Sequence, residues 1–360
     1  MKHTPLYDVH VQCGARMVDF AGWEMPILYT GIIEEHNQTR SIASLFDVSH
    51  MGRFELRGAD AEPLLQLVCT RQLGDAQVGQ SRYSHVCNPA SGILDDVIVS
   101  RYSDHWLMVC NASNRDRIVA WLKQHAAGKD VWLDDITEQT LMVALQGPAV
   151  LGILAAKLPI PLGDLKRYHF KSGDFMGIPY SIFRSGYTGE DGVEMILPAS
   201  VAPLLLPMVT GTIDGGLGIK PAGLGARDTL RMEAGMPLYG HELNEQTDSI
   251  SAGLAWCVDL GKDFIGVEKL REVAARGPAR KLMGLELEGR RIARPGTIVL
   301  DGGRPAGQVT SGTFSPTLGK SIAMAYVEAA LAEPGRTLNV DLAGKANPAT
   351  VVPLPFYKRK

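Results

Sequence analysis

Cysteine is scarce in this sequence, and the few cysteines present form no motif. Five occur among 360 residues, at positions 13, 69, 87, 110 and 257, without a C-x-x-C pair. An odd number of widely spaced cysteines is atypical of a disulfide framework and of a structural zinc site. We therefore expect free thiols, mostly buried as small apolar side chains, in a reducing compartment, and no metal centre.

An excess of charge and a long hydrophobic run are also missing. Lys and Arg number 36 and Asp and Glu 39, so the net charge is −3, which gives no basis for bulk electrostatic binding to nucleic acid or acidic membranes. No apolar run approaches the roughly 18 residues that a membrane span requires. Residues Met1–Asp8 resemble neither a signal peptide nor a transit peptide. We therefore expect a cytoplasmic protein with no nucleic-acid and no membrane partner.

The motifs of several enzyme classes are missing as well. There is no G-x-S-x-G elbow, no Walker loop and no H-E-x-x-H pair. Ser49 precedes His50, but a lone Ser-His dipeptide is more typical of a histidine packed in a loop than of a nucleophile with its base.

What is present has the composition of an ordinary globular chain, 45% hydrophobic and 21% charged, with the length of roughly two to three domains. Between residues 52 and 136, strands alternate with two helices, and this predicts an α+β sandwich of ferredoxin-like kind. We expect strands at 52–57, 81–88, 92–100, 106–110 and 131–136, and helices at 61–70 and 113–126, the latter capped by Ser113.

A second block, from 140 to about 240, predicts a strand at 141–146, a helix that begins at Pro148, a hairpin of 178–186 with 192–197, and a helix at 222–234 ended by Gly235. The polar stretch 274–281 predicts a linker. After it, six short strands predict a small all-β barrel or sandwich, at 282–288, 297–300, 305–311, 322–327, 337–341 and 349–353.

Adjacent carboxylates in one predicted strand form the first candidate site. Alternation places Asp95 with Ile93 and Val97 on one face, and Asp96 with Leu94 on the other. Because both faces are apolar, at least one carboxylate lies among hydrophobic side chains, which is costly unless it is paired or used. The alternative is a pair at a sheet end that caps a turn.

Two further segments are candidates for ligand binding. In 186–194, three glycines let the backbone turn tightly, and Glu194 shares an apolar face with Ile196; the alternative is an ordinary hairpin with a polar rim. In the helix at 222–234, Arg227 and Arg231 lie on one stripe, which suits the capture of a ligand carboxylate; the alternative is a surface ion-pair set with Asp228.

Taken in order, several segments together resemble one known family over essentially the whole chain. They are TPLY at 4–7, FAGW at 20–23, LFDVSHM at 45–51, GILDD at 92–96, ALQGP at 144–148, GYTGEDGVE at 186–194, ARDTLRMEAGMPLYG at 226–240, TSG at 310–312 and PFY at 355–357. The sequence is similar to aminomethyltransferase, the T-protein of the glycine cleavage system.

The resemblance implies an α+β, three-domain clover-leaf fold with a C-terminal β-barrel, in which tetrahydrofolate binds in a central hole. We expect domain 1 at 1–50 plus 137–240, domain 2 at 51–136 plus 241–275, and the barrel at 280–360. The resemblance also implies a partner, lipoylated H-protein, which carries the aminomethyl group. The other glycine cleavage proteins would be indirect partners. The reaction that the resemblance implies releases ammonia and forms 5,10-methylenetetrahydrofolate.

The resemblance further assigns roles to individual residues. Asp96 becomes the catalytic carboxylate, and Glu194 the bidentate acceptor for the pterin. Tyr187 would pack on the pterin, and Arg227 would face the folate. The further folate-binding positions are Asn111, Tyr357, Met51, Tyr83 and Tyr239.

One position departs from the family pattern, and two related functions stay open. Ser91 stands where the first of two glycines is usual. A folate-dependent demethylase of a small N-methyl or sulfonium substrate would share the Glu194 and Arg227 chemistry. A non-catalytic folate-binding relative would carry a cysteine in the loop that here reads SGYTGED at 185–191.

Overall fold

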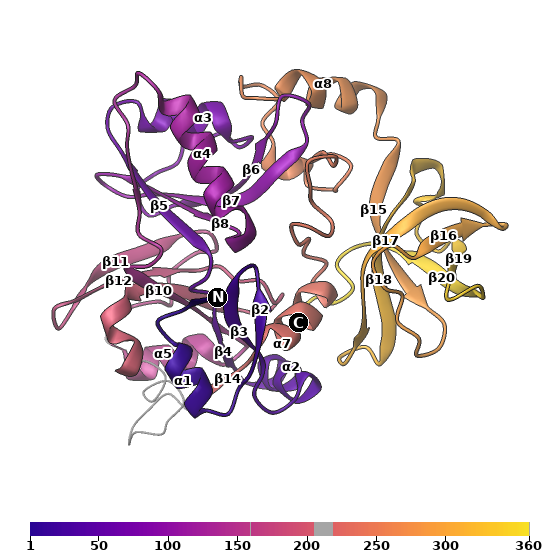
Figure 1. The fold of residues 1–360 in the computed structure, drawn as a ribbon, viewed down its shortest axis with the longest axis horizontal. Helices are drawn as coiled ribbons and strands as arrows, with labels where there is room; N and C mark the ends of the chain where they lie inside the picture. The colour runs from indigo at the N-terminus through magenta and orange to yellow at the C-terminus, as the bar shows by residue number, and fades with distance from the viewer. Residues whose placement is uncertain (159, 205–218, 360) are drawn as a thin grey trace. The chain divides into compact units, whose positions relative to one another are not determined.

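A computed structural model describes residues 1–158, 160–204 and 219–359, and these divide into two compact units (Figure 1). The N-terminal unit comprises Met1–Leu64, Leu73–Arg82 and Val97–Asp228. The C-terminal unit comprises Leu65–Gln72, Tyr83–Asp96 and Thr229–Lys360.

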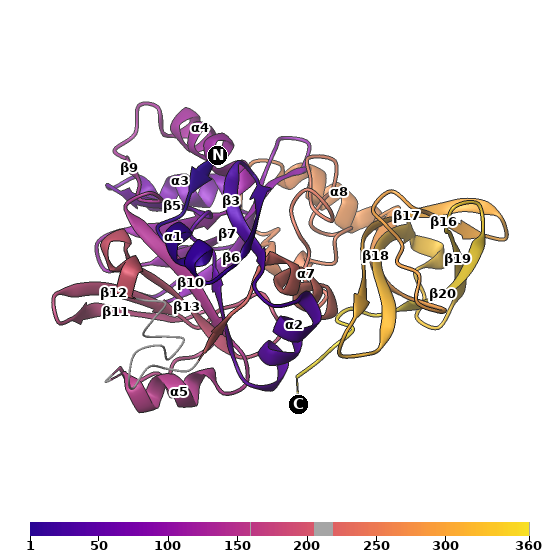
Figure 2. The same ribbon diagram turned by 60° about the horizontal axis from the view of Figure 1, so that its bottom comes forward.

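A six-stranded sheet organises the N-terminal unit, in the order β11-β12-β13-β10-β4-β14. Its odd-numbered side chains on β4, β10 and β13, among them Leu45, Leu145 and Val193, form a buried core with Val150 and Leu154 of α5. Figure 2 shows α5 lying along this side of the sheet. The strands are β4 (Ser44–Asp47), β10 (Thr140–Gln146), β11 (Phe170–Phe175), β12 (Ile178–Phe183), β13 (Gly192–Pro198) and β14 (Lys220–Pro221), and α5 is Val150–Lys157.

A small sheet of order β1-β3-β2 and two helices precede this sheet in the chain. Glu35, in the first turn of α2, accepts the backbone N–H groups of Tyr29, Thr30 and Gly223. This buried carboxylate thereby ties α2 to the start of α7 (Leu224–Glu233). The elements are β1 (Lys2–His3), α1 (Tyr7–Gln12), β2 (Arg16–Phe20), β3 (Trp23–Leu28) and α2 (Ile32–Ser41).

A five-stranded sheet of order β6-β7-β8-β5-β9 contains residues of both units, because β6 and β7 cross the boundary between them. The order β7-β8-β5-β9, with α3 after β5 and α4 after β8, is that of a split β-α-β arrangement. Helix α4 lies along one face of the sheet (Figures 1 and 2). The elements are β5 (Gly52–Arg57), α3 (Ala61–Val68), β6 (Ser81–Cys87), β7 (Ile93–Arg101), β8 (Trp106–Cys110), η1 (Ala112–Asn114), α4 (Arg115–Ala126) and β9 (Trp132–Asp135).

The C-terminal unit ends in a closed barrel, in the order β15-β18-β17-β16-β19-β20, which confirms the predicted barrel. Alternate small and branched side chains, such as Ala323, Ala325 and Val327 of β18, fill its interior. The strands are β15 (Arg280–Leu287), β16 (Ile298–Asp301), β17 (Arg304–Ser315), β18 (Lys320–Glu328), β19 (Thr337–Asp341) and β20 (Ala346–Val352). The remaining elements are η2 (Ala199–Val201), α7 (Leu224–Glu233), η3 (Ala255–Cys257), α8 (Val267–Arg276) and η4 (Ala329–Leu331).

Several local predictions were wrong. Ser113 does not cap α4, because it lies inside η1 and the helix begins after Asn114. Pro148 is not the first helical residue, since α5 begins at Val150. The predicted linker 274–281 is mostly ordered structure: α8 continues to Arg276 and β15 begins at Arg280. Within the described ranges, no helix is long and apolar enough to cross a membrane.

Candidate functional site

Glu194 lies at the middle of the six-stranded sheet, on the face opposite the α5 core. In the antiparallel register it pairs with Ala144 of β10, which in turn pairs with Phe46 of β4. Glu194 is 5% exposed, and Ser185 donates its hydroxyl to Oε2 at 2.5 Å. A buried carboxylate needs such donors or a charge partner. The predicted apolar setting of Glu194 is therefore present in the structure.

Arg227 approaches this carboxylate from α7. Its guanidinium carbon lies 4.9 Å from the ring centroid of Tyr187, within the range of a cation–π contact. Burial lowers the pKa of Arg227, whereas the charge of Glu194 opposes that shift. Nη1 of Arg227 is buried, and none of the described residues accepts a hydrogen bond from it. The structure thus brings together Glu194, Tyr187 and Arg227.

Local contacts fix the segments that carry Tyr187 and Arg227. Arg40 of α2 donates to the Thr188 carbonyl at 2.7 Å. Gly186 lies so close to Gln146 that a Cβ would come within 1.9 Å of its Oε1, so a larger residue would force the Gln146 side chain or the loop to shift. At the start of α7, a Cβ on Gly223 would lie 2.4 Å from the backbone of Ile27. Both segments are therefore held before any ligand binds.

His50 lies in a turn after β4 and is 5% exposed. Burial lowers its pKa to about 4; the charge of Asp47 opposes this shift, whereas the positive charges of Arg227 and Arg53 act in the same direction as burial. The ring contacts Phe20 edge-on at 5.4 Å between centroids. Within the part of the chain that the structure describes, its buried Nδ1 has no hydrogen-bond partner. The histidine is neutral at physiological pH.

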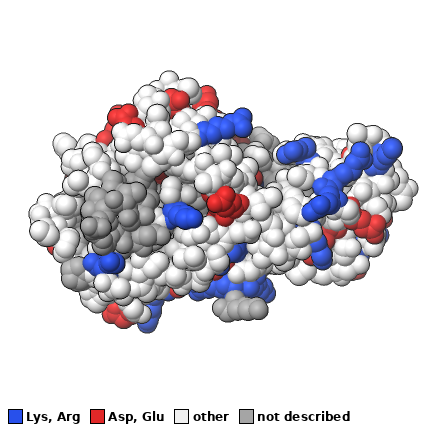
Figure 3. Space-filling view, turned by 90° about the horizontal axis from the view of Figure 1, so that it is seen from below, with Lys and Arg blue, Asp and Glu red and all other residues white. Residues whose placement is uncertain are grey.

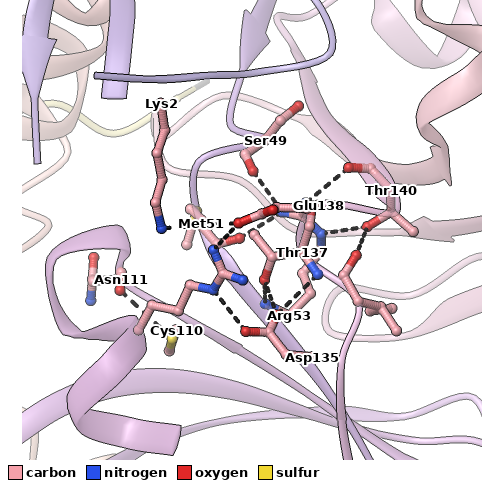
Figure 4. Close-up of polar contacts among 12 residues, drawn as sticks. Lys2, Ser49, Met51, Arg53, Cys110, Asn111, Asp135, Thr137, Glu138 and Thr140 are labelled. Carbon is pink, nitrogen blue, oxygen red and sulfur yellow. Dashed lines mark hydrogen bonds and ion pairs between the residues drawn. The ribbon is translucent and has the colours of Figure 1, made fainter. Parts of the chain in front are cut away.

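Arg53 fixes the backbone on both sides of His50 (Figure 4). It is fully buried, and it donates to the carbonyls of Ser49 at 3.1 Å and Met51 at 2.6 Å. It also donates to the carbonyls of Thr137 and Thr140, at 2.5 and 3.1 Å, and to the Thr140 hydroxyl at 2.8 Å. These contacts position Met51, one of the predicted folate-binding residues, at the end of the turn.

Asn111 is also in the N-terminal unit, between β8 and η1. It is half-buried and appears with Met51 in the view of Figure 4. Gly52 of β5 pairs with Cys110, the residue before Asn111. A Cβ on Gly52 would lie 2.6 Å from the Cys110 sulfur, which explains a glycine at this crossing.

Asp96 and Tyr83 are in the C-terminal unit, where the Tyr83 hydroxyl donates to Oδ2 of Asp96 at 3.1 Å. Trp256 stacks on Tyr83 at 5.4 Å between centroids, and His85 meets its edge at 5.5 Å. Asp96 is half-buried, whereas the fully buried carboxylate of the pair is Asp95. The aromatic contacts hold Tyr83 in place beside Asp96.

A cysteine, a histidine and a serine lie close together next to Tyr83, whose ring contacts the histidine, His85. Cys257 Sγ lies 3.8 Å from both ring nitrogens of His85, whose Nδ1 is 2.7 Å from the Ser249 hydroxyl. Burial raises the pKa of Cys257 to about 12, with a smaller contribution from Asp96, and lowers that of His85 to about 3. A neutral thiol beside a neutral imidazole is no activated nucleophile. This group is part of the packing.

Arg231, on the same helix as Arg227, has a structural role. Its Nη1 donates to Glu242 at 2.8 Å, and its Nη2 to Ser311 at 2.9 Å. The two arginines of the predicted stripe therefore differ in their surroundings, and Arg231 forms a buried ion pair with Glu242.

The two remaining predicted positions, Tyr239 and Tyr357, lie in the C-terminal unit and are half-buried. Tyr239 packs with the Cys87 and Ile93 cluster. The backbone N–H of Tyr357 donates to the Glu233 carbonyl at 2.8 Å.

Ser91 adopts φ +68°, so the position that departs from the family pattern does require a left-handed backbone. Among the described residues, no group of three His, Cys, Asp or Glu side chains could hold a metal ion. The five cysteines are free thiols, and all except Cys13 are buried.

The sequence patterns did not indicate the roles of Arg53 and Trp256. The sequence did contain a signal for the burial of Arg53, because this residue lies in β5, a mostly apolar strand with little exposure. The contact of Trp256 with Tyr83 spans more than 170 positions, and no local pattern predicts it.

Known proteins match the chain over its full length. Residues 6–262 match the GCVT N-terminal domain, and residues 280–358 the glycine cleavage T-protein C-terminal barrel domain. An aminomethyltransferase of Desulfitobacterium hafniense is 45% identical, covering 100% of this chain and 99% of its own. One of Rubrobacter xylanophilus is 46% identical, covering 100% and 95%. The crystal structure of the glycine cleavage system aminomethyltransferase T from Bartonella henselae is 35% identical, with a TM-score of 0.93, covering 100% and 99%. The chain therefore belongs to the glycine cleavage T-protein family of aminomethyltransferases.

Proposed function

We propose that this aminomethyltransferase releases ammonia from an aminomethyl group carried by lipoylated H-protein and transfers the one-carbon unit to tetrahydrofolate. The observation that carries the proposal is the meeting of Glu194, Tyr187 and Arg227 in the N-terminal unit. The family membership supplies the reaction class.

The chemistry of these side chains fits tetrahydrofolate. A pterin presents adjacent amino and ring N–H donors, and a carboxylate such as Glu194 is the natural acceptor for both. The Tyr187 ring offers an aromatic face for stacking. The buried Nη1 of Arg227 has no acceptor within residues 1–158, 160–204 and 219–359, and it is a suitable donor for the benzoylglutamate portion.

Bound tetrahydrofolate supplies the nucleophilic nitrogen that takes up the one-carbon unit. Glu194 and Arg227 orient it, and the segments around both residues are fixed in advance, so little ordering is needed on binding. Asp96 is the proposed catalytic carboxylate. A fixed negative charge there stabilises positive charge that develops on the reacting carbon, and the Tyr83 hydroxyl holds Asp96 in one orientation.

Met51, Asn111, Tyr239 and Tyr357 are proposed as further folate contacts, on the strength of their match to the family motifs. The three-domain division at 1–50 plus 137–240, 51–136 plus 241–275, and 280–360 is likewise a proposal.

The proposed partner is lipoylated H-protein, with the other glycine cleavage proteins as indirect partners. Docking must be transient, which implies a small and partly polar interface. Arg290, Arg291 and Arg294, here called the basic loop, are all exposed between β15 and β16. Figure 3 shows Lys and Arg side chains gathered over the barrel. Such a surface suits an acidic carrier.

A substrate comparison separates this proposal from demethylation of a small N-methyl or sulfonium compound. The enzyme and tetrahydrofolate are given either aminomethyl-loaded H-protein or the small compound, and the folate product is identified by mass. The proposal expects 5,10-methylenetetrahydrofolate from the loaded carrier alone. Turnover of the small compound, with none of the carrier, would refute it.

A further inference from the structure

Several hydrogen bonds from other parts of the chain hold the backbone of the turn that carries His50. Arg53 donates to the carbonyls of both neighbours, Ser49 and Met51. The Ser49 hydroxyl exchanges hydrogen bonds with the Met142 backbone, as donor to its carbonyl at 3.1 Å and as acceptor from its N–H at 3.0 Å. The Ser49 N–H also donates to Asp47 Oδ1 at 2.8 Å. The backbone on each side of His50 is therefore fixed.

The side chain of His50 contrasts with this backbone. Its Nδ1 is buried, and no described residue bonds to it. A buried polar atom without a partner costs about 1–3 kcal/mol, so a packed histidine is expected to have both nitrogens bonded. His10, in the same unit, meets that expectation, with Nε2 2.9 Å from Asp47 and Nδ1 2.7 Å from the Tyr29 hydroxyl.

The position of His50 connects it to the proposed folate site. His50 immediately precedes Met51, one of the proposed folate contacts, and it lies in the same unit as Arg227. The charges of Asp47 and Arg227 both act on its ring, in opposite directions. Arg227 likewise has a buried polar atom that finds no acceptor in the described chain. Two such atoms, at or next to proposed folate contacts, indicate groups that await a ligand.

We propose that His50 is a further binding residue of this site, whose Nδ1 hydrogen-bonds the reduced pterin cofactor held by Glu194 and Arg227. The inference rests on the proposed function. A neutral imidazole can serve as donor or acceptor, and it adds no charge beside Arg227. Arg53 is the positioning residue that fixes the turn so that the ring is presented in one place.

Three variants separate binding from packing. His50→Asn keeps a polar amide near the place of Nδ1, and His50→Leu keeps the bulk without a polar atom. His10→Leu is the matched control, because both nitrogens of that ring are bonded within the protein. For each we measure the Kd of tetrahydrofolate by anaerobic calorimetry and the thermal midpoint of unfolding of the full chain.

We expect His50→Leu to raise the Kd about 2- to 12-fold, as for one lost hydrogen bond, without lowering the thermal midpoint. His50→Asn should bind within about 2-fold of wild type, whereas His10→Leu should lower the midpoint clearly. A lower midpoint with unchanged Kd in His50→Leu would show that His50 only packs, and equal loss in the Asn and Leu variants would show that Nδ1 makes no contact. If wild type itself fails to bind tetrahydrofolate, the proposed function falls and this inference with it. Normal wild-type binding with an unaffected His50→Leu overturns the inference alone.

Discussion

Replacing Arg227 by methionine tests the proposed folate site, because Arg227 is a buried charge that is proposed to donate a hydrogen bond to the ligand. In the free protein the guanidinium lies over Tyr187 near Glu194, with Nη1 buried and unbonded among the described residues. Binding adds a charged hydrogen bond there without breaking one inside the protein. Such a bond contributes about 1.5–3 kcal/mol. We therefore expect Arg227→Met to raise the Kd of tetrahydrofolate about 10- to 150-fold.

This variant should lose less stability than a variant in which a hydrogen-bonded ion pair is broken. Glu194 loses the nearby positive charge but keeps the Ser185 hydroxyl as a donor. Arg231→Met is the matched control on the same helix, because its guanidinium donates to Glu242, to Ser311 and to the Met236 carbonyl. Breaking that buried pair should cost about 3–5 kcal/mol of stability.

Calorimetry with tetrahydrofolate gives the Kd, and urea unfolding gives the stability. Glu194→Gln and the double variant complete a cycle, and we expect coupling of Glu194 with Arg227, since both act on one ligand. An unchanged Kd in Arg227→Met, with a stability loss like that of Arg231→Met, would reduce Arg227 to a structural residue and refute the reasoning.

Three further predictions concern other parts of the molecule. Asp96→Asn should bind tetrahydrofolate nearly normally but lose turnover by about 10²- to 10⁴-fold, measured as ammonia release; full activity there, with an inactive Asp95→Asn, would assign the role to the wrong carboxylate. Reversal of the basic loop to glutamate should raise the KM for aminomethyl-loaded H-protein several-fold, less so in added salt; an unmoved KM at low ionic strength would place docking elsewhere. Burial holds the pKa of His85 at about 3, below the ordinary value near 6.5, so between pH 6.5 and 3 the unfolded state binds more protons and stability falls as the pH is lowered. His85→Asn, followed by urea unfolding, should remove about 3 kcal/mol of the loss between pH 6.5 and 4, and identical pH profiles would contradict the assigned burial.

Local pattern was enough for much of the fold. The strands β5, β8 and β19 have the predicted bounds, because alternation and turn residues within each segment determine them. The hairpin partner β12 of Glu194 and the end of α7 near Gly235 follow from the same kind of signal. The linker prediction at 274–281 was wrong because Ala274, Ala275 and Arg276, all strong helix formers, make up the exposed last turn of α8.

The candidate site was predictable only in part, because a sequence pattern indicates which side chains are buried but not which distant residues they contact. Apolar alternation around Glu194 indicated a buried carboxylate, and the structure shows one. Apolar alternation could not show that Arg231 pairs with Glu242 and Ser311, the latter eighty positions away. Nor could it show that Nη1 of Arg227 finds no acceptor among the described residues. His50 was interpreted as a packed loop residue because sequence carries no information on whether a ring nitrogen finds a partner.

The central claim is that this chain couples ammonia release to tetrahydrofolate. The direct measurement is a single-turnover assay with aminomethyl-loaded H-protein in excess and tetrahydrofolate limiting, in which ammonia and 5,10-methylenetetrahydrofolate are quantified together. The account predicts equal amounts of the two products, each set by the tetrahydrofolate added, and loss of both in Asp96→Asn. Ammonia release at the same rate and extent without tetrahydrofolate would contradict it.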